Sequence, residues 1–193
     1  MDVVARIEAA ASRWNVLDHP FYQRWSAGEL TQAELAEYAA QYRYAVEALA
    51  DAAAAAGDDE HAAEEREHVA LWDAFAAGCG SVSADANEET LACASSWTAG
   101  DDRLERLAVL YAIESAQPAI SQTKLEGLLG HYGFEEGPAT EYFSLHAERD
   151  HEHAAHSRKL LEKFATDEDA PRLAARAEAA ARGNWLLLDG VSG

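Results

Sequence analysis

The sequence predicts an all-α protein, and two observations carry that prediction. Hydrophobic residues make up 49% of the 193 residues, alanine is abundant and there are only four prolines, a composition that favours helices over strands. Apolar side chains also recur three and four residues apart along much of the chain, as they do on the buried face of a helix. We expect one domain spanning residues 1–193, because no linker or internal repeat divides the chain and its length allows a substantial core.

Three helices are expected at the start of the chain. Apolar spacing predicts the first over 3–14, and a proline at an early helical position predicts a short, aromatic-rich second helix over 20–28. Thr31 and Glu34 have the spacing of a capping box, in which two side chains bind the first free amides of a helix. They predict a long third helix over 31–57.

Aspartates mark the start of the next helix. Asp58 or Asp59 can accept hydrogen bonds from its first amides, and this helix stops near Gly78 to Gly80. A shorter helix is expected over 84–97.

Asp101 or Asp102 starts a further helix that continues to Leu129. Pro118 must kink it or open a bulge, since proline removes a backbone hydrogen bond. The last two expected helices are those over 142–153 and 169–188.

The charge and the apolar pattern exclude several classes of function. Fifteen basic against 35 acidic residues give a net charge of −20, which repels nucleic acid and anionic lipid. The N-terminus has no signal-peptide pattern and no apolar run is long enough to span a bilayer, so a cytoplasmic protein is expected. Cys79 and Cys93 lack a metal-binding spacing and are expected to be reduced thiols, without the neighbours that would activate a cysteine nucleophile.

One segment near the C-terminus has the spacing of a metal site. His146, Asp150 and His153 are four and then three residues apart, so that on a helix two imidazoles and a carboxylate share one face. This set suits iron, manganese or zinc. The alternative is a solvated helix face in an acidic, histidine-rich protein.

Two other helices can supply matching ligands. Glu64 and Glu65 lie four and three residues before His68, and Glu-x-x-His is a common way to hold metal pairs in bundles, although solvated glutamate-rich helices produce the same spacing. Glu114 lies in a largely uncharged segment where a carboxylate needs a partner, and Pro118 disturbs the helix next to it. Three carboxylates and three imidazoles fit two irons with positions open to dioxygen better than one structural zinc.

The chain also resembles a known family. The residues that carry the resemblance are, in order, His19-Pro20-Phe21-Tyr22, Glu64-Glu65, His68-x-x-Leu71-Trp72, Tyr111-x-x-Glu114, Lys124-x-x-Gly127-Leu128, Tyr132-Gly133-Phe134 and Tyr142-Phe143-x-x-His146-x-x-x-Asp150-x-x-His153. They are similar to those of the haem-oxygenase-like diiron oxidases, and most similar to the branch with the CADD-like para-aminobenzoate synthases, which share a fold with the TenA thiaminases and PqqC oxidases.

The resemblance implies a seven-helix bundle with a buried dinuclear iron centre. The implied ligands are Glu64 or Glu65, His68, Glu114, His146, Asp150 and His153. The segment between the glutamate pair and His68 is shorter than in the CADD-like proteins, which leaves the choice within the pair open. We expect Glu65, because its spacing to His68 repeats Glu-x-x-His.

The resemblance also implies roles for Tyr22 and Lys124. In CADD-like synthases a tyrosine of the protein becomes the aminobenzoate ring and a lysine supplies its amino group, and these two residues match those positions. Alternatively, Tyr22 is an ordinary core aromatic, and Lys124 extends from a helix face to solvent or holds a substrate carboxylate. Tyr38, Tyr42, Tyr44 and Tyr111 are candidates for radical relays or for packing.

Three hypotheses follow from the sequence. The leading one is a diiron oxidase that uses dioxygen and an external reductant to oxidise its own Tyr22 or a small amine, amino acid or fatty acid. The second is a metal-free, TenA-like protein that binds or hydrolyses a small heterocycle. The third is a helical interaction module. The sequence leaves the oligomeric state open, with a homodimer among the options.

Overall fold

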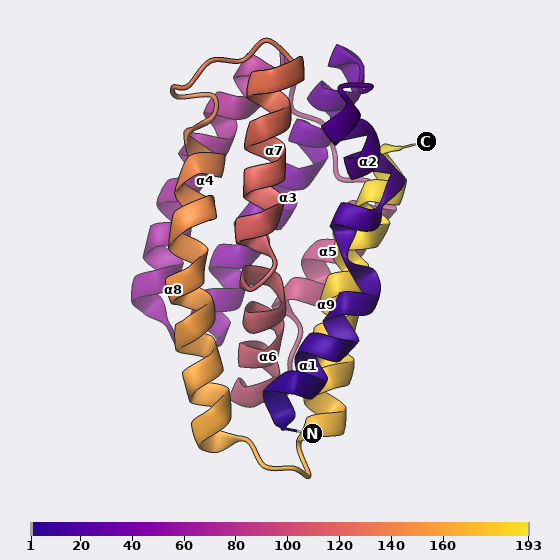
Figure 1. Ribbon diagram of the computed structural model, residues 1–193. Helices are drawn as coiled ribbons and strands as arrows, with labels where there is room; N and C mark the ends of the chain where they lie inside the picture. Colours follow the sequence, from indigo (N-terminus) through magenta and orange to yellow (C-terminus); the bar gives the residue numbers. More distant parts are fainter. Residues whose placement is uncertain (1, 193) are drawn as a thin grey trace.

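The computed structural model describes residues 2–192, and all regular structure within them is helical (Figure 1). The all-α prediction is therefore confirmed. The α-helices are α1 (Val3–Ala11), α2 (Pro20–Ala27), α3 (Gln32–Ala55), α4 (Asp59–Gly78), α5 (Glu88–Thr98), α6 (Arg103–Glu114), α7 (Gln117–His131), α8 (Glu141–Phe164) and α9 (Ala170–Val191), with short 3-10 turns at Ser12–Trp14 and Val16–Asp18.

The helices form an elongated bundle. In Figure 1, α6 and α7 stand end to end through its middle, with α4 and α8 on one side and α1, α5 and α9 on the other. The pairs α3 with α4, α7 with α8 and α1 with α9 have extensive contacts, and α6 packs against both α8 and α9. A site between α4, α6 and α8 therefore lies inside the bundle.

Several helix starts have the predicted caps. The Thr31 side chain accepts from the backbone amide of Glu34, and the Glu34 carboxylate accepts from the amide of Thr31, so the capping box is present. Of the two aspartates offered for α4, Asp58 is the cap, and for α6 the cap is Asp102. These caps satisfy amides that a helix start leaves free, and so fix where each helix begins.

The helix around Pro118 is broken rather than kinked. α6 ends at Glu114 and α7 begins at Gln117, which places Pro118 in the first turn of α7, where its missing amide costs no helical hydrogen bond. The break divides one of the eight expected helices in two, so the described residues form nine α-helices, two more than the seven-helix bundle that the resemblance implies. It also lets α6 and α7 present Glu114 and Lys124 from separate helices.

An aromatic core fills the bundle where α2, α3, α4, α7 and α8 meet. The largest fully buried side chains include Trp25, Trp72, Tyr22, Tyr38, Tyr42 and Tyr142. Their rings pack edge to face or tilted, with Tyr38 in contact with Trp25 and Trp72 at centroid distances of 5.6 and 5.9 Å. Aromatic pairs in these arrangements add stability beyond the area they bury.

A glycine brings α2 close to α7. The indole of Trp25 lies against Gly127, where an added Cβ would be 2.4 Å from Nε1, and Nε1 donates a hydrogen bond to the carbonyl of Lys124 at 3.2 Å. Any larger residue at Gly127 would push α2 away. This contact holds the helix that carries Tyr22 against the helix that carries Lys124.

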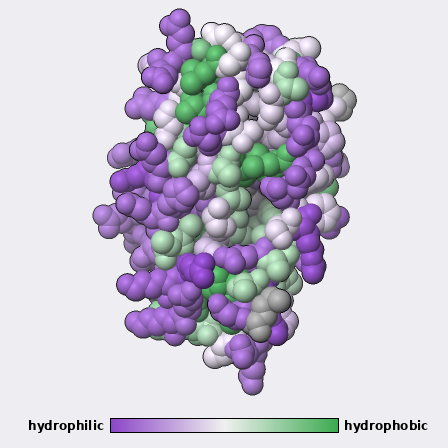
Figure 2. Space-filling view, viewed as in Figure 1, coloured by the Kyte–Doolittle hydropathy of each residue, from purple (hydrophilic) through white to green (hydrophobic). Residues whose placement is uncertain are grey.

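One face of the molecule is drawn in Figure 2 and is mostly hydrophilic. On the face drawn in Figure 2, hydrophilic residues cover most of the area, and hydrophobic ones form separate small groups. Within the described residues, no helix is both long enough and apolar enough to cross a bilayer.

Candidate metal centre

Three helices direct imidazoles and carboxylates into one buried space. α4 contributes His61, Glu65 and His68, which are four and three residues apart and therefore share one face. α6 contributes Glu114 at its C-terminal end, and α8 contributes His146, Asp150 and His153 along its inner face. Most of these side chains are fully buried, and His153 is partly exposed.

Glu65 lies at the centre of this set. Its carboxylate is 0% exposed, and its two oxygens face different imidazoles. Oε1 is 3.5 Å from Nε2 of His61, while Oε2 is 3.3 Å from Nδ1 of His68 and 3.5 Å from Nε2 of His146. A carboxylate in this position can bridge two cations.

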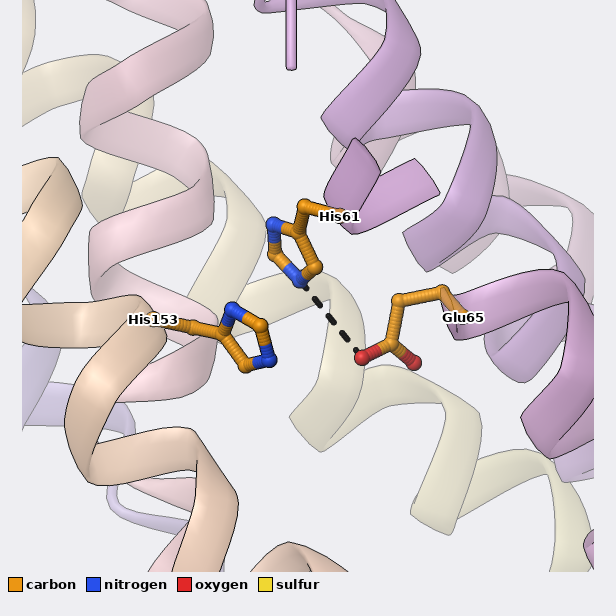
Figure 3. A group of neighbouring side chains, drawn as sticks. All are labelled: His61, Glu65 and His153. Carbon is orange, nitrogen blue, oxygen red and sulfur yellow. Dashed lines mark ion pairs between the residues drawn. The ribbon is translucent and has the colours of Figure 1, made fainter. Parts of the chain in front are cut away.

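Two groups of ligand atoms share that carboxylate. One group consists of His61, Glu65 and His153, and the other of Glu65, His68 and His146, with all ligand atoms of each group within 4.8 Å of one another. Figure 3 shows His61 and His153 converging on Glu65 from two helices. The two imidazoles are stacked, with ring centroids 3.9 Å apart and an interplanar angle of 6°.

Glu114 and Asp150 complete the acidic set. Glu114 Oε1 is 3.2 Å from Nε2 of His61. Burial, followed by the charges of Asp150 and Glu65, raises the pKa of Glu114 well above its usual range, and burial raises the pKa of Asp150 to about 7. Burial opposes ionisation of Glu65 too, but the attraction of the imidazoles of His146, His61 and His68 outweighs it and holds the pKa of Glu65 well below its usual range.

The arrangement fits a pair of divalent cations. The described residues offer no hydrogen-bond partner to one or more ligand atoms of each of His61, Glu65, His68, Glu114, His146, Asp150 and His153. Several atoms approach within 3.5 Å without hydrogen-bond geometry, so their lone pairs point into a common space. Buried carboxylates without partners are costly, and the four positive charges of two divalent cations would more than offset the three negative charges of Glu65, Glu114 and Asp150. Four imidazoles together with these carboxylates suit iron or manganese.

His61 is a further candidate ligand, and it was not predicted from the sequence. The signal was present, because His61 is four residues before Glu65 and seven before His68, which is helical spacing. Glu64 is placed differently from its neighbour. Its side chain is 34% exposed and lies between Arg149 Nη2 at 3.4 Å and His153 Nε2 at 3.5 Å, outside both ligand groups.

Tyr22 and Lys124 lie in the aromatic core, which adjoins the candidate metal centre where Tyr142 stacks on His146. Lys124 is 0% exposed, so the alternative that it extends to solvent is wrong. Its Nζ has no hydrogen-bond partner among the described residues and lies 5.7 Å from the ring centroid of Tyr22. Four further rings are within 6 Å of Nζ, those of Tyr38, Tyr42, Trp72 and Phe143. Burial lowers the pKa of Lys124 to about 7, while the charge of Asp150 raises it.

Of the remaining tyrosines, Tyr44 and Tyr111 have structural partners, whereas the Tyr42 hydroxyl has no hydrogen-bond partner among the described residues. The Tyr44 hydroxyl donates to the carbonyl of Ala84, and that of Tyr111 donates to Glu8. Cys79 and Cys93 are buried free thiols, and burial raises the pKa of Cys79 to about 12. Neither thiol is activated as a nucleophile.

A family comparison agrees with this geometry. Residues 21–185 match the model of a haem-oxygenase-like family that is described as iron-containing redox enzymes. The chain belongs to this family. The resemblance drawn from the motifs is thereby confirmed, and iron-containing redox chemistry is the general activity of the family.

Two relatives of this chain carry a more specific name. A 4-aminobenzoate synthase from Nitrosomonas europaea is 30% identical, and the alignment covers 96% of this chain and 89% of the relative. A 4-aminobenzoate synthase from Chlamydia muridarum is 29% identical, with 92% and 85% covered.

Solved structures support the fold of the family. A TenA homologue from P. horikoshii superposes with a TM-score of 0.79 at 12% identity, covering 99% of this chain and 98% of that one. A TenA homologue from Pseudomonas syringae gives a TM-score of 0.79 at 17% identity, covering 98% and 91%. At these identities the likeness concerns the fold alone.

Proposed function

We propose that this protein is a non-haem diiron oxidase that uses dioxygen to form 4-aminobenzoate from its own Tyr22, with nitrogen from Lys124. The observation that carries the proposal is the Lys124 amine. It is fully buried without a hydrogen-bond partner among the described residues, and aromatic rings that include Tyr22 surround it. The names of the relatives at about 30% identity support the same product.

The residues that would hold two irons are His61, Glu65, His68, Glu114, His146, Asp150 and His153, and Glu65 belongs to both groups of ligand atoms. When bound, the irons would supply the reduction of dioxygen, with electrons from an external reductant. The protein holds this chemistry inside the bundle, so that few groups other than its own side chains are within reach of an oxidant.

The aromatic core positions the residue to be oxidised. The Tyr142 ring stacks on the imidazole of His146 at a centroid distance of 4.0 Å, and Trp72 packs against Tyr142 at 5.0 Å. Trp72 also contacts Tyr38, whose hydroxyl is 2.9 Å from that of Tyr22. A continuous set of buried rings therefore connects one proposed ligand with Tyr22.

The lysine is prepared as a nitrogen donor. Because burial lowers its pKa to about 7, a large fraction of Lys124 is the neutral amine at neutral pH, with a free lone pair. The surrounding rings fix the position of Nζ and leave it no competing acceptor. A positioned neutral amine can add to the oxidised ring at the carbon that carries the phenol oxygen, which would leave as water. The Cα–Cβ bond of Tyr22 and the Cε–Nζ bond of Lys124 would then break, with Cβ oxidised to the carboxylate, Cε left as an aldehyde and dioxygen as the oxidant.

The test is a single-turnover experiment with labelled protein. Protein carrying ring-deuterated tyrosine and nitrogen-15 lysine is loaded with iron and exposed to oxygen and reductant. We expect at most one 4-aminobenzoate per chain, carrying both labels, and a matching loss of mass at Tyr22.

Matched variants complete the test. Tyr22→Phe should abolish the product, while Tyr44→Phe, at a peripheral tyrosine, should not. Lys124→Ala should remove the labelled nitrogen, while Lys159→Ala, on the exposed face of α8, should retain it. Many unlabelled turnovers by Tyr22→Phe would instead identify an oxidase of an external small amine, amino acid or fatty acid.

A further inference from the structure

A surface cavity reaches the metal centre from one side. Its volume is about 470 Å³, and its walls come from the start of α4, the N-terminal two-thirds of α6 and the middle of α8. His61 and His153, which belong to one of the two ligand groups, form part of its lining. The cavity therefore connects solvent with that group directly.

The charge of the cavity favours cations. Four carboxylates and two guanidiniums line it, those of Asp58, Glu60, Glu64, Glu152, Arg103 and Arg149. Together with the net charge of −20 of the whole chain, the acidic side chains produce a negative electrostatic potential in the cavity. Such a field raises the local concentration of positive ions.

Unpartnered nitrogens face the inner end of the cavity. His61 is 5% exposed, and its Nε2 has no hydrogen-bond partner among the described residues. The same is true of Nε2 of His153, which stacks on His61. These buried atoms point to a ligand independently of the acidic lining.

Glu64 lies between the mouth and the inner end. It is partly exposed, with one oxygen 3.4 Å from Arg149 and the other 3.5 Å from Nε2 of His153. One turn further along α8, His156 lies 3.7 Å from Asp58 at the outer rim. Two pairs of a histidine and a carboxylate therefore lie one helical turn apart along α8. They are His156 with Asp58 at the outer rim and His153 with Glu64 further in.

We propose that this cavity is the entry port of the metal centre, and that Glu64 and His153 form a transient site for a divalent cation. The cation binds first between Oε2 of Glu64, which is buried without a hydrogen-bond partner among the described residues, and Nε2 of His153. It then moves inward to the group of His61, Glu65 and His153, so that His153 keeps the cation as Glu64 releases it. This inference rests on the proposed metal centre and assigns Glu64 a role in loading rather than as a permanent ligand.

Loading kinetics test the port. Metal-free protein is mixed with Fe²⁺ under anaerobic conditions, and at intervals an excess of a coloured Fe²⁺ chelator is added. The iron that resists the chelator gives the loading rate and the final iron content. Glu64→Gln should load about tenfold more slowly, since charged clefts change association rates by ~10 to 10³. Its final iron content should equal that of the wild type.

Two further variants complete the design. Glu67→Gln makes the same charge change on an exposed face of α4 outside the cavity, and should load at the wild-type rate. Leu160→Trp fills the cavity without changing charge, and should also slow loading. The folded state of each variant is checked by circular dichroism.

The outcomes separate the port from the metal centre. Equal rates for Glu64→Gln and Glu67→Gln, with full iron in both, would overturn the port and leave the proposed function intact. A lower final iron content in Glu64→Gln would show a permanent ligand and overturn the transient site. No chelator-resistant iron in the wild type would overturn the metal centre, and the port with it.

Discussion

The hydroxyls of Tyr22 and Tyr38 are 2.9 Å apart in a part of the core that is closed to solvent. Burial raises the pKa of each phenol well above its usual range, so both stay protonated and one donates to the other. Each hydroxyl thus depends on its partner, which makes the pair suitable for a double-mutant cycle.

In metal-free protein, Tyr22→Phe or Tyr38→Phe should lower the free energy of unfolding by about 1–3 kcal/mol, because each leaves one buried hydroxyl unsatisfied. The double variant should cost less than the sum, with a coupling of about 1 kcal/mol. Urea denaturation of the four proteins measures both quantities. Additive losses would contradict the hydrogen bond.

The two adjacent glutamates of α4 should differ in their effect on iron content. Glu65→Ala removes the carboxylate shared by both ligand groups and should abolish binding of both irons. Glu64→Ala changes a side chain outside both groups and should retain both at equilibrium. Iron per chain after anaerobic loading and desalting decides the matter, and a full complement in Glu65→Ala would refute the shared position.

His61 should matter for one metal position only. It belongs to the group with His153, whereas His68 belongs to the group with His146. We therefore expect His61→Ala and His68→Ala each to bind about one iron per chain and His61→Ala/His68→Ala to bind almost none, since lost ligands weaken a metal site strongly. Wild-type stoichiometry in His61→Ala would remove this residue from the centre.

Lys124 should make the stability of metal-free protein depend on pH. Burial lowers its pKa to about 7, whereas an unfolded lysine titrates near 10.4, so between these values the unfolded chain binds the extra proton. The free energy of unfolding should rise with pH across this window by up to about 1.4 kcal/mol per pH unit.

Lys124→Met keeps the length of the side chain and removes the charge. It should be more stable than the wild type by about 2–5 kcal/mol at pH 7, with the difference closing towards pH 10. Titrating groups that do not interact with Lys124 are common to both proteins and cancel, and Asp150, whose charge raises the pKa of Lys124, is the exception. Denaturation at three pH values checks this, and parallel profiles would mean that Lys124 is protonated at neutral pH in the folded state.

Much of the fold followed from local signals. Thr31, Glu34, Asp58 and Asp102 are caps whose hydrogen bonds depend on neighbours a few residues away, so the sequence was enough to place those helix starts. The break beside Pro118 was less accessible. Proline prevents a continuous helix, but packing of α6 and α7 against α8 decides between a kink and two helices.

The candidate site shows a similar division. Helical spacing brought together His146, Asp150 and His153 on α8. It did not distinguish Glu64 from Glu65, because residues four and three positions before His68 can both share its helix face. The rotation of α4 relative to α8 decides which of the two is buried. His61 was not predicted, because it lies four residues before Glu65 and so falls outside the Glu-x-x-His motif of Glu65 and His68.

Burial of Tyr22 bears on how long a molecule of this protein lasts. Its ring is 1% exposed and packs against Phe21, Trp25 and Tyr38. Under the proposed reaction, removing that ring would leave a void, and loss of a buried aromatic ring costs about 3–5 kcal/mol, a large part of the ~5–15 kcal/mol that holds a domain folded. A spent chain would unfold more readily and become a preferred target of cellular proteases. Output would then be set by the rate of translation, and the polypeptide would be consumed as a reagent.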